Sequence, residues 1–251
     1  VISHAPPTNE PFKFTPVKLP FVLRLDDANL QKLVIKSSTS AINFYKIQLN
    51  DAVWSDNKIE FENSALAMDF LSVNKATGHI ELDKKYPLDL KAHVILPALE
   101  NLNVRDIAVV AKGDLDTLKV GVASALPSLV SGNAVLHPVR EFVPMRAKLY
   151  WSELDIPVAP EQELHSNLGA INLSGDLRQL NINADLDLIG KNIPQGQYQA
   201  QLNTDLNQLN ITQFFGHLMQ GELNLRGNLN WQDGLKWDVY GRMQDINPKD
   251  K

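Results

Sequence analysis

Apolar and polar residues alternate one by one through much of this chain, and that period of two limits what it can fold into. Segment 221–231 places Leu223, Leu225, Leu229 and Trp231 on one side, with charged and amide residues between them. Because successive side chains on a β-strand point to opposite faces, this segment predicts a strand with one apolar and one polar face.

The same alternation recurs in six further segments, which are 88–94, 145–151, 171–177, 182–188, 198–206 and 235–243. Between 221–231 and 235–243, Asp233-Gly234 predicts a two-residue hairpin turn, because this dipeptide tolerates the positive φ of a primed turn. Segments 64–71 and 212–219 fit a short helix as well as a strand. We expect a nearly all-β chain of about fifteen strands.

A loose repeat accompanies the strands. Asp176-Leu-Arg-Gln-Leu-Asn-Ile-Asn183 nearly recurs as Asp205-Leu-Asn-Gln-Leu-Asn-Ile-Thr212, and 114–120 is a shorter third copy. In an array of hairpins such a unit is a strand end, a short reversal and the start of the next strand. Leucine is abundant, so chance accounts for some copies, but the near-identity of two eight-residue stretches favours a genuine repeat.

The composition excludes several classes of function. The 251 residues include 24 Lys+Arg and 29 Asp+Glu, a net charge of −5, so nucleic acid is not an expected partner. The absence of cysteine excludes disulfide scaffolds, zinc ribbons and thiol nucleophiles. No apolar run approaches the roughly 18 residues of a membrane-spanning helix, the sequence contains no charged-then-apolar signal peptide, and it opens at Val1 without an initiator Met. We therefore expect a processed or excised piece of a longer protein.

Candidate catalytic residues are few. The six histidines stand at no metal-ligand spacing, and neither a phosphate-binding loop nor a nucleophile motif occurs. Asp185 and Asp187 would share a strand face about 6.6 Å apart, near the lower limit for an inverting glycosidase, and Asp114 and Asp116 make a similar pair. Alternation marks that face as solvated, where nothing raises a carboxyl pKa. We expect no enzyme, no catalytic residue, no metal and no cofactor.

The apolar strand faces could be covered in two ways. Two sheets could bury them against each other in a β-sandwich, which periodicity alone favours as the commonest arrangement. Alternatively, one long sheet could curl into a trough whose lining stays accessible. Since monomers rarely expose a contiguous apolar patch beyond several hundred Å², an open trough would imply an apolar ligand.

Leucine-rich strands punctuated by Asn, Gln and Asp, and preceded by a Gln-Gly turn, resemble the TamB family of AsmA-like proteins. The similarity is carried by 209–231 with its Met219-Gln-Gly221 turn, by Leu235-Lys-Trp237, and by 245–248. Gly175-Asp-Leu and Ile193-Pro-Gln-Gly196 fit the same layout. The best match covers 145–248, and 20–144 is compatible in style.

The resemblance implies an open β-taco trough rather than a sandwich, in a periplasmic segment of a protein anchored in the bacterial inner membrane outside this piece. It implies a lipid transport role, in which phospholipid moves toward the outer membrane. It also implies outer-membrane biogenesis, including autotransporter assembly, with a TamA-type barrel that contacts another region of these proteins. An alternative for this segment is a scaffold that receives a client strand at a sheet edge.

We expect a Pro-rich extended lead-in over 1–20, or simply a frayed terminus, followed by a single elongated trough over 21–248. Gly175 and Gly227 on the apolar face would mark bends, space for the lining, or bulges. For any one lining residue, ordinary core packing is an equally good interpretation. The residues expected to line the trough and contact lipid are Met145, Leu149, Trp151, Leu173, Leu186, Leu188, Leu202, Leu223, Leu225, Leu229, Trp231, Trp237 and Val239.

Overall fold

The computed structural model describes residues 16–36, 41–68, 71–96, 104, 106–124, 128–159, 162–190, 193–205, 207–232 and 234–247. Most of the expected Pro-rich lead-in, residues 1–15, lies outside these ranges. The strands are β1 (Leu19–Leu30), β2 (Leu33–Lys36), β3 (Ala41–Asp56), β4 (Lys58–Met68), β5 (Ser72–Glu81), β6 (Leu88–Ile95), β7 (Ile107–Gly113), β8 (Leu118–Ser124), β9 (Leu129–Leu136), β10 (Met145–Ala159), β11 (Gln162–Asp176), β12 (Gln179–Gly190), β13 (Gly196–Thr204), β14 (Gln208–Leu218), β15 (Gly221–Asn230) and β16 (Lys236–Gln244).

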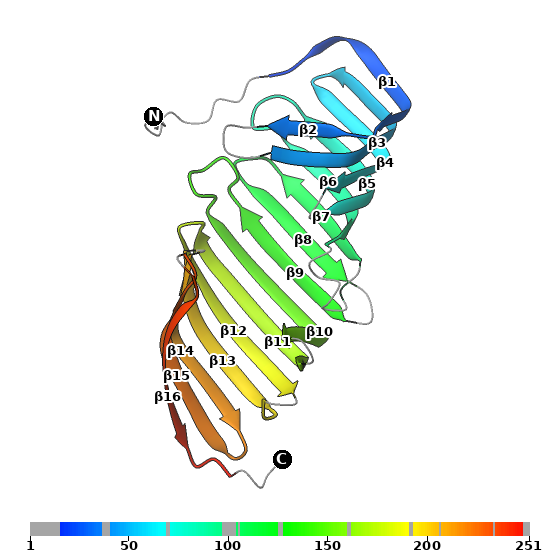
Figure 1. Ribbon diagram of the computed structural model, residues 1–251. Helices are drawn as coiled ribbons and strands as arrows, with labels where there is room; N and C mark the ends of the chain where they lie inside the picture. The colour runs from blue at the N-terminus through cyan, green and yellow to red at the C-terminus, as the bar shows by residue number, and fades with distance from the viewer. Residues whose placement is uncertain are drawn as a thin grey trace.

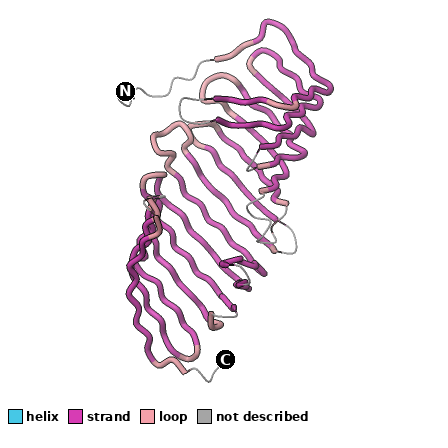
Figure 2. Tube along the Cα trace, viewed as in Figure 1, coloured by secondary structure: helices cyan, strands magenta, loops and turns pink. Residues whose placement is uncertain are grey.

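All sixteen strands belong to one antiparallel sheet, in which fifteen follow one another and β2 pairs with the far end of β3 (Figure 1). Every pairing partner in the path from β3 to β16 is also the next strand in the sequence. Across the described ranges there is no helix and no second sheet, as the trace in Figure 2 shows. The prediction of one curled sheet is confirmed, and the sandwich alternative is wrong. Nor do these ranges contain a helix long and apolar enough to cross a membrane.

Irregularities inside the strands bend the sheet. Asp51, Asn63 and Lys75 have φ values of 47°, 48° and 51° in the middle of β3, β4 and β5. The pairing register shifts beside each of them. A bulge bends its strand and increases the local twist, so three consecutive strands change direction together at these residues. This alignment of bulges curves the sheet without a second layer.

The sequence repeat is a hairpin turn stabilised by an aspartate. Asp205 Oδ1 accepts the backbone N–H groups of Asn207 and Gln208, both at 3.0 Å. Asp176 and Asp114 accept the corresponding pairs of N–H groups two and three residues later. This is an Asx turn, in which the side chain replaces a missing backbone partner. The predicted strand end, reversal and new strand are confirmed at all three copies.

These turns lie along one rim of the sheet and bond to one another. The Leu115 N–H donates to Lys85 O at 2.9 Å, and the Val139 N–H donates to Leu115 O at 3.2 Å. Further along the rim, the Leu177 N–H donates to Phe142 O at 2.8 Å. Each bond links one hairpin turn to the next hairpin along the sheet. The rim therefore holds neighbouring hairpins together beyond the strand ladders themselves.

The last hairpin exists, but its predicted two-residue turn is wrong. Strand pairing stops at Asn230 and resumes at Lys236, so the connection covers 231–235, of which Asp233 lies outside the described residues. Asn230 Oδ1 accepts the Gln232 N–H at 3.1 Å, which reverses the chain early. The Trp231 N–H donates to Asn207 O of the neighbouring turn at 3.1 Å, instead of joining the β15–β16 ladder.

The two segments with ambiguous periodicity are strands where the structure describes them; residues 69–70 lie outside it. In β14 the register shifts between Ile211 and Phe214, so Thr212 is an extra residue that opposes no partner. This bulge spaces Ile211, Phe214 and Leu218 by three and four, which imitates a helix, although all three occupy one face of the sheet.

Candidate functional site: the apolar groove

The concave face of the sheet carries apolar residues in continuous cross-strand rows. The pairing registers join one row that passes through all fifteen strands of the path, with Thr204 as its single polar member. That row is Leu23, Trp54, Ile59, Ile80, Leu88, Gly113, Leu118, Leu136, Met145, Gly175, Leu180, Thr204, Leu209, Leu229 and Trp237.

Three further rows run beside it toward the opposite rim. None of these four rows, all made of described residues, contains a charged side chain. The second is Phe61, Gly78, Leu90, Ala111, Val120, Ala134, Ala147, Leu173, Ile182, Leu202, Ile211, Gly227 and Val239. The third is Ala92, Val109, Val122, Gly132, Leu149, Ile171, Ala184, Ala200, Phe214, Leu225 and Gly241. The fourth is Val130, Trp151, Gly169, Leu186, Tyr198, Gly216, Leu223 and Met243.

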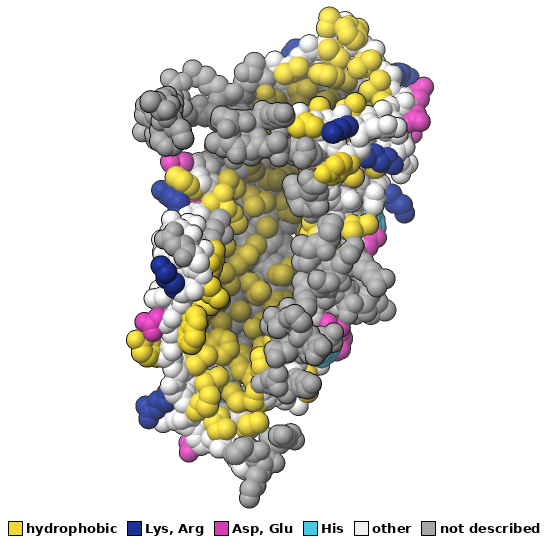
Figure 3. Space-filling model, viewed as in Figure 1, with side chains coloured by type: hydrophobic (Ala, Val, Ile, Leu, Met, Phe, Trp, Pro, Cys, Tyr) yellow, Lys and Arg dark blue, Asp and Glu magenta, His cyan; other side chains and the backbone are white. Residues whose placement is uncertain are grey.

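These rows form a hollowed apolar surface that runs along the length of the sheet (Figure 3). Most of their side chains are half-buried, as expected for a lining that is covered by its neighbours along the sheet but by no opposing layer. Neighbouring strands lie about 4.8 Å apart, so the fifteen strands of the path give a groove about 70 Å long.

One margin of the groove is packed closed near its middle. Trp151 is 6% exposed and clusters with Val104, Ile107 and Leu154. Its indole N–H donates to Ser166 Oγ at 2.9 Å. A second cluster follows along the same margin, formed by Leu188, Tyr198 and Leu218. Two small cores of described residues therefore anchor the groove along this margin.

Glycines give the aromatic lining residues their space. A Cβ on Gly169 would lie 2.1 Å from the Trp151 ring, and one on Gly216 would lie 2.9 Å from the Tyr198 ring. Gly175 and Gly227 have a different role. Their φ values are 134° and 157°, and a Cβ on either would lie 2.1 Å from a carbonyl oxygen of the paired strand. Both therefore permit close backbone approach, and neither is the extra residue of a bulge.

The structure places the thirteen predicted lining residues in three environments. Trp151 and Leu188 are buried in the two clusters, at 6% and 7% exposure. Trp231 lies in the β15–β16 connection and Trp237 lies on the end strand, at 44% and 69% exposure. The remaining nine are half-buried on the concave face, and they are Met145, Leu149, Leu173, Leu186, Leu202, Leu223, Leu225, Leu229 and Val239.

The lining also contains residues that sequence reasoning missed. Tyr198 follows the period of two in segment 198–206, so the alternation was sufficient to identify it as a lining residue. Phe214 could not, because the bulge at Thr212 breaks the period of two. In the first half of the sheet, Ile59, Ile80 and residues like them belong to strands whose bulges obscure the alternation.

The two aspartates of each candidate catalytic pair were expected to share a solvated strand face, and this prediction holds for one pair only. Asp185 and Asp187 lie on the convex face, opposite Gln199 and Gln197 of β13. Asp114 and Asp116 do not share a strand face, because they lie in the β7–β8 turn where Asp114 accepts backbone N–H groups. Within the described ranges, no three His, Asp or Glu side chains are grouped so that they could hold a metal ion.

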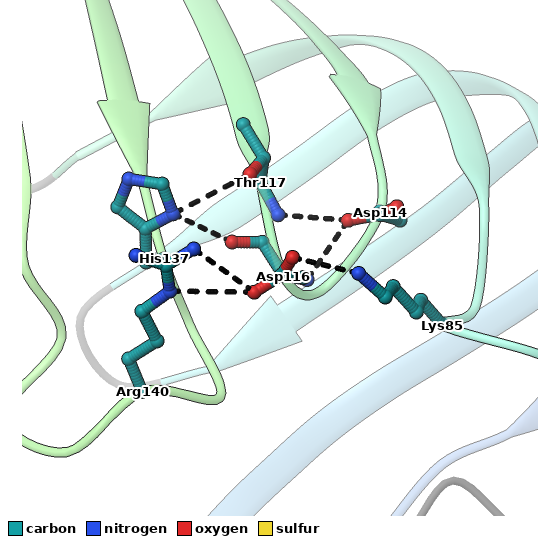
Figure 4. Close-up of polar contacts among 6 residues, drawn as sticks. All are labelled: Lys85, Asp114, Asp116, Thr117, His137 and Arg140. Carbon is teal, nitrogen blue, oxygen red and sulfur yellow. Dashed lines mark hydrogen bonds and ion pairs between the residues drawn. The ribbon is translucent and has the colours of Figure 1, made fainter.

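Asp116 instead joins three turns of the rim (Figure 4). Lys85 Nζ lies 2.8 Å from Asp116 Oδ2, and Arg140 Nε lies 3.3 Å from Oδ1. His137 Nδ1 lies 2.6 Å from the Asp116 carbonyl oxygen. The hydrogen bond from Lys85, with that from Arg140, lowers the pKa of Asp116 despite partial desolvation, and the same contact raises the pKa of Lys85. Asp116 is therefore a structural brace between the three turns, and its carboxylate is already paired with Lys85 and Arg140.

A second ionic group lies where the packed margin begins. His165 on β11 lies 2.8 Å from Asp155 Oδ1 through Nδ1 and 3.2 Å from Glu153 Oε2 through Nε2, both on β10. Glu153 has a φ of 55° and marks the bend in β10 beyond Trp151. The hydrogen bond that the His165 ring donates to Asp155, with the charges of Asp155 and Glu153, raises the pKa of His165 although partial burial opposes it.

Comparison with known proteins finds one family that the chain resembles in sequence. The family model described as "TamB, N-terminal domain" matches residues 5–251. The "Translocation and assembly module subunit TamB" of Haemophilus influenzae is 24% identical over 204 residues, which are 76% of this chain and 15% of the relative. The chain thus spans less than a sixth of that relative's length. No solved structure matches the chain.

Proposed function

Because this chain belongs to the TamB family, we propose that its groove shields phospholipid acyl chains as lipids pass between the inner and outer membranes of a bacterial envelope. The observation that carries the proposal is the set of four uncharged apolar rows, one of which runs through every strand of the path. An apolar surface this continuous needs an apolar ligand to be favourable in water.

The energetics favour a groove over free diffusion. Transfer of an acyl chain into water costs about 0.8 kcal/mol per CH₂, or about 13 kcal/mol for sixteen carbons. A lining that replaces the bilayer contacts lowers this barrier without chemistry and without a discrete site. The polar headgroup would remain in water at the open side of the groove, where no second layer of the described residues covers it.

In this proposal the segment is periplasmic, and the whole protein acts with an outer-membrane TamA-type barrel through a region outside this chain. The Haemophilus influenzae relative is a translocation and assembly module subunit, which supports a role in outer-membrane biogenesis. The chain itself would supply only the conduit.

Site-specific photo-crosslinking tests the proposal. Leu225 faces the groove between Phe214 and Gly241, whereas its neighbour Asn224 faces outward beside Phe215. A crosslinker at position 225 should capture phospholipid in cells and one at position 224 should not. Equal labelling of the two positions would contradict the proposal. As a second measurement, mass spectrometry of protein purified without detergent should find bound phospholipid, and Leu225→Arg should lower its amount.

A second candidate function rests on the end strand. Among the described residues β16 pairs with β15 alone, and it carries Trp237, Tyr240 and Met243 at 69%, 71% and 69% exposure. An edge with exposed apolar side chains on both faces suits addition of a client β-strand through backbone hydrogen bonds. In that case Leu225→Arg would leave client binding intact, while a proline in β16 would abolish it.

A further inference from the structure

The convex face of the sheet carries two adjacent rows of amide side chains in cross-strand register. We call these rows the amide ladders. They run across β11–β14 and β12–β15. The first ladder is Asn172, Asn183, Gln201 and Gln213, and the second is Asn181, Asn203, Asn210 and Asn228.

These amides are not explained by the needs of the sheet. Asparagine is disfavoured in strands, where threonine or lysine would be equally soluble. Among the described residues, two hydrogen bonds tie ladder amides to the sheet: Asn181 Nδ2 donates to Ser174 O at 3.2 Å, and Asn203 Nδ2 donates to Thr212 Oγ1 at 3.1 Å. Six of the eight ladder side chains are exposed, and the other two are half-buried. Most of their donors and acceptors therefore face outward.

A depression of about 510 Å³ adjoins the first ladder. Its convex-face lining combines Tyr150 and Leu168, which are 46% and 64% exposed, with Asp185 and Gln199. It forms where Ala170, a small side chain, stands between Tyr150 and Asp185 in one cross-strand row. The volume lies within the range of about 300–1,000 Å³ that is typical of small-molecule sites.

The lining of this depression is chemically complementary to an acetamido group. A carboxylate at Asp185 accepts from an amide N–H, and the Gln199 amide can donate to a carbonyl oxygen. Tyr150 and Leu168 offer apolar surface for a methyl group or a sugar ring face. An N-acetylated hexose presents all of these groups together, and its ring hydroxyls both donate and accept, as the ladder amides do.

Charge and spacing narrow the class of ligand. The ladders carry no charge, and the charged side chains that continue their cross-strand rows include Lys148 and Arg146 on β10 and Asp238 on β16, so the net counter-charge for a polyanion is small. The eight ladder side chains include no aromatic or aliphatic anchor of the kind found at protein interfaces, and exposed apolar surface is supplied beside them by Tyr150 and Leu168 of the depression. Strands lie about 4.8 Å apart, which is close to the length of one sugar in an extended β-linked chain. We propose that the convex face binds a neutral glycan of β-linked N-acetylated hexoses, with one sugar in the depression and the following sugars along the amide ladders.

Titration of the 251-residue chain with chitohexaose, monitored by calorimetry and by amide NMR shifts, tests this inference. We expect saturable binding. The double variant Asn183→Thr/Gln201→Thr should bind about ten-fold more weakly, because two hydrogen-bonding amides are lost. Threonine favours strands, so this variant should fold. The matched control, Asn29→Thr/Asn74→Thr on β1 and β5, should bind like the wild type.

Comparison ligands and a groove variant complete the test. Cellohexaose, which lacks the acetamido groups, should bind about ten-fold more weakly than chitohexaose. Absence of chitohexaose binding, equal binding of the two oligosaccharides, preference for a heparin fragment, or equal affinity of the ladder and control variants would each overturn the inference. Leu225→Arg should keep glycan binding, because Leu225 faces the groove, so failure of the lipid proposal is distinguishable from failure of this one.

Discussion

Substitution of Gly169 by Ala tests whether Trp151 packs against the sheet as a fixed part of the groove margin. The added Cβ would lie 2.1 Å from Trp151 Cζ2 and 2.3 Å from Cε2, against ordinary contacts of 3.4–4 Å. The indole must therefore move by more than an ångström. It is 6% exposed, it packs with Val104 and Leu154, and its N–H is bonded to Ser166 Oγ, so movement disrupts all three contacts.

The cost has two parts. Overpacking a well-packed site costs about 1–3 kcal/mol. Loss of the indole hydrogen bond adds about 1 kcal/mol, since both partners are buried. Gly169→Ala should therefore lower the free energy of unfolding by about 2–4 kcal/mol. Gly121→Ala is the matched control, because a Cβ added to Gly121 on strand β8 would meet no heavy atom within 4 Å. That control should be neutral or stabilising by up to about 1 kcal/mol.

Urea unfolding followed by tryptophan fluorescence and circular dichroism measures both variants. Trp151 is buried, whereas Trp231 and Trp237 are 44% and 69% exposed, so a displaced indole should also shift the native emission to longer wavelength. Equal unfolding midpoints and unchanged emission for the Gly169 and Gly121 variants would refute the packing argument.

Three further predictions concern polar groups. Asp205→Ala should lower the thermal midpoint, by less than Gly169→Ala does, because two turn N–H groups lose their acceptor; an unchanged midpoint would contradict the Asx-turn assignment. His165 has a raised folded pKa owing to Asp155, so its stabilisation is fully present below the unfolded pKa of about 6.5 and is lost as pH rises through the folded value. The stability difference between wild type and His165→Gln should therefore shrink from about pH 5.5 to about pH 8.5 in urea titrations; a constant difference would refute it. Asp116 has a lowered pKa owing to Lys85, so its contribution is present above an unfolded pKa of about 3.9 and is lost on acidification through the folded value. Asp116→Asn should flatten that acid dependence, and an unchanged acid profile would argue against the brace.

Local patterns were sufficient to predict the strands of the C-terminal half and the turns at Asp176 and Asp205, but not the turn between β15 and β16. Alternation around Leu225 and Leu186 indicates which side chains share a face, because the strand period is a property of the backbone alone. The aspartate repeat predicts turns at Asp176 and Asp205 because an Asx turn uses atoms within four residues. The same reasoning failed at Phe214, where a bulge whose position depends on two partner strands shifts the pattern by one residue.

The groove itself could not be predicted from local sequence patterns alone. Alternation alone favours a closed sandwich as the commonest arrangement, so the TamB resemblance is the only sequence feature that favours an open sheet. Which residues face each other across two strands depends on parts of the chain that are far apart in sequence. The row from Leu23 to Trp237 crosses fifteen strands, and its register is set by every hairpin in between.

Short-range periodicity and turn chemistry are enough to specify a chain of β-hairpins with one apolar face. The curling of this face into a groove, with no opposing layer among the described residues, and the alignment of the outward amides into ladders can be seen only in the folded sheet. Both outcomes depend on the registers and bulges that accumulate across the whole sheet, and these are properties of paired strands rather than of any one segment.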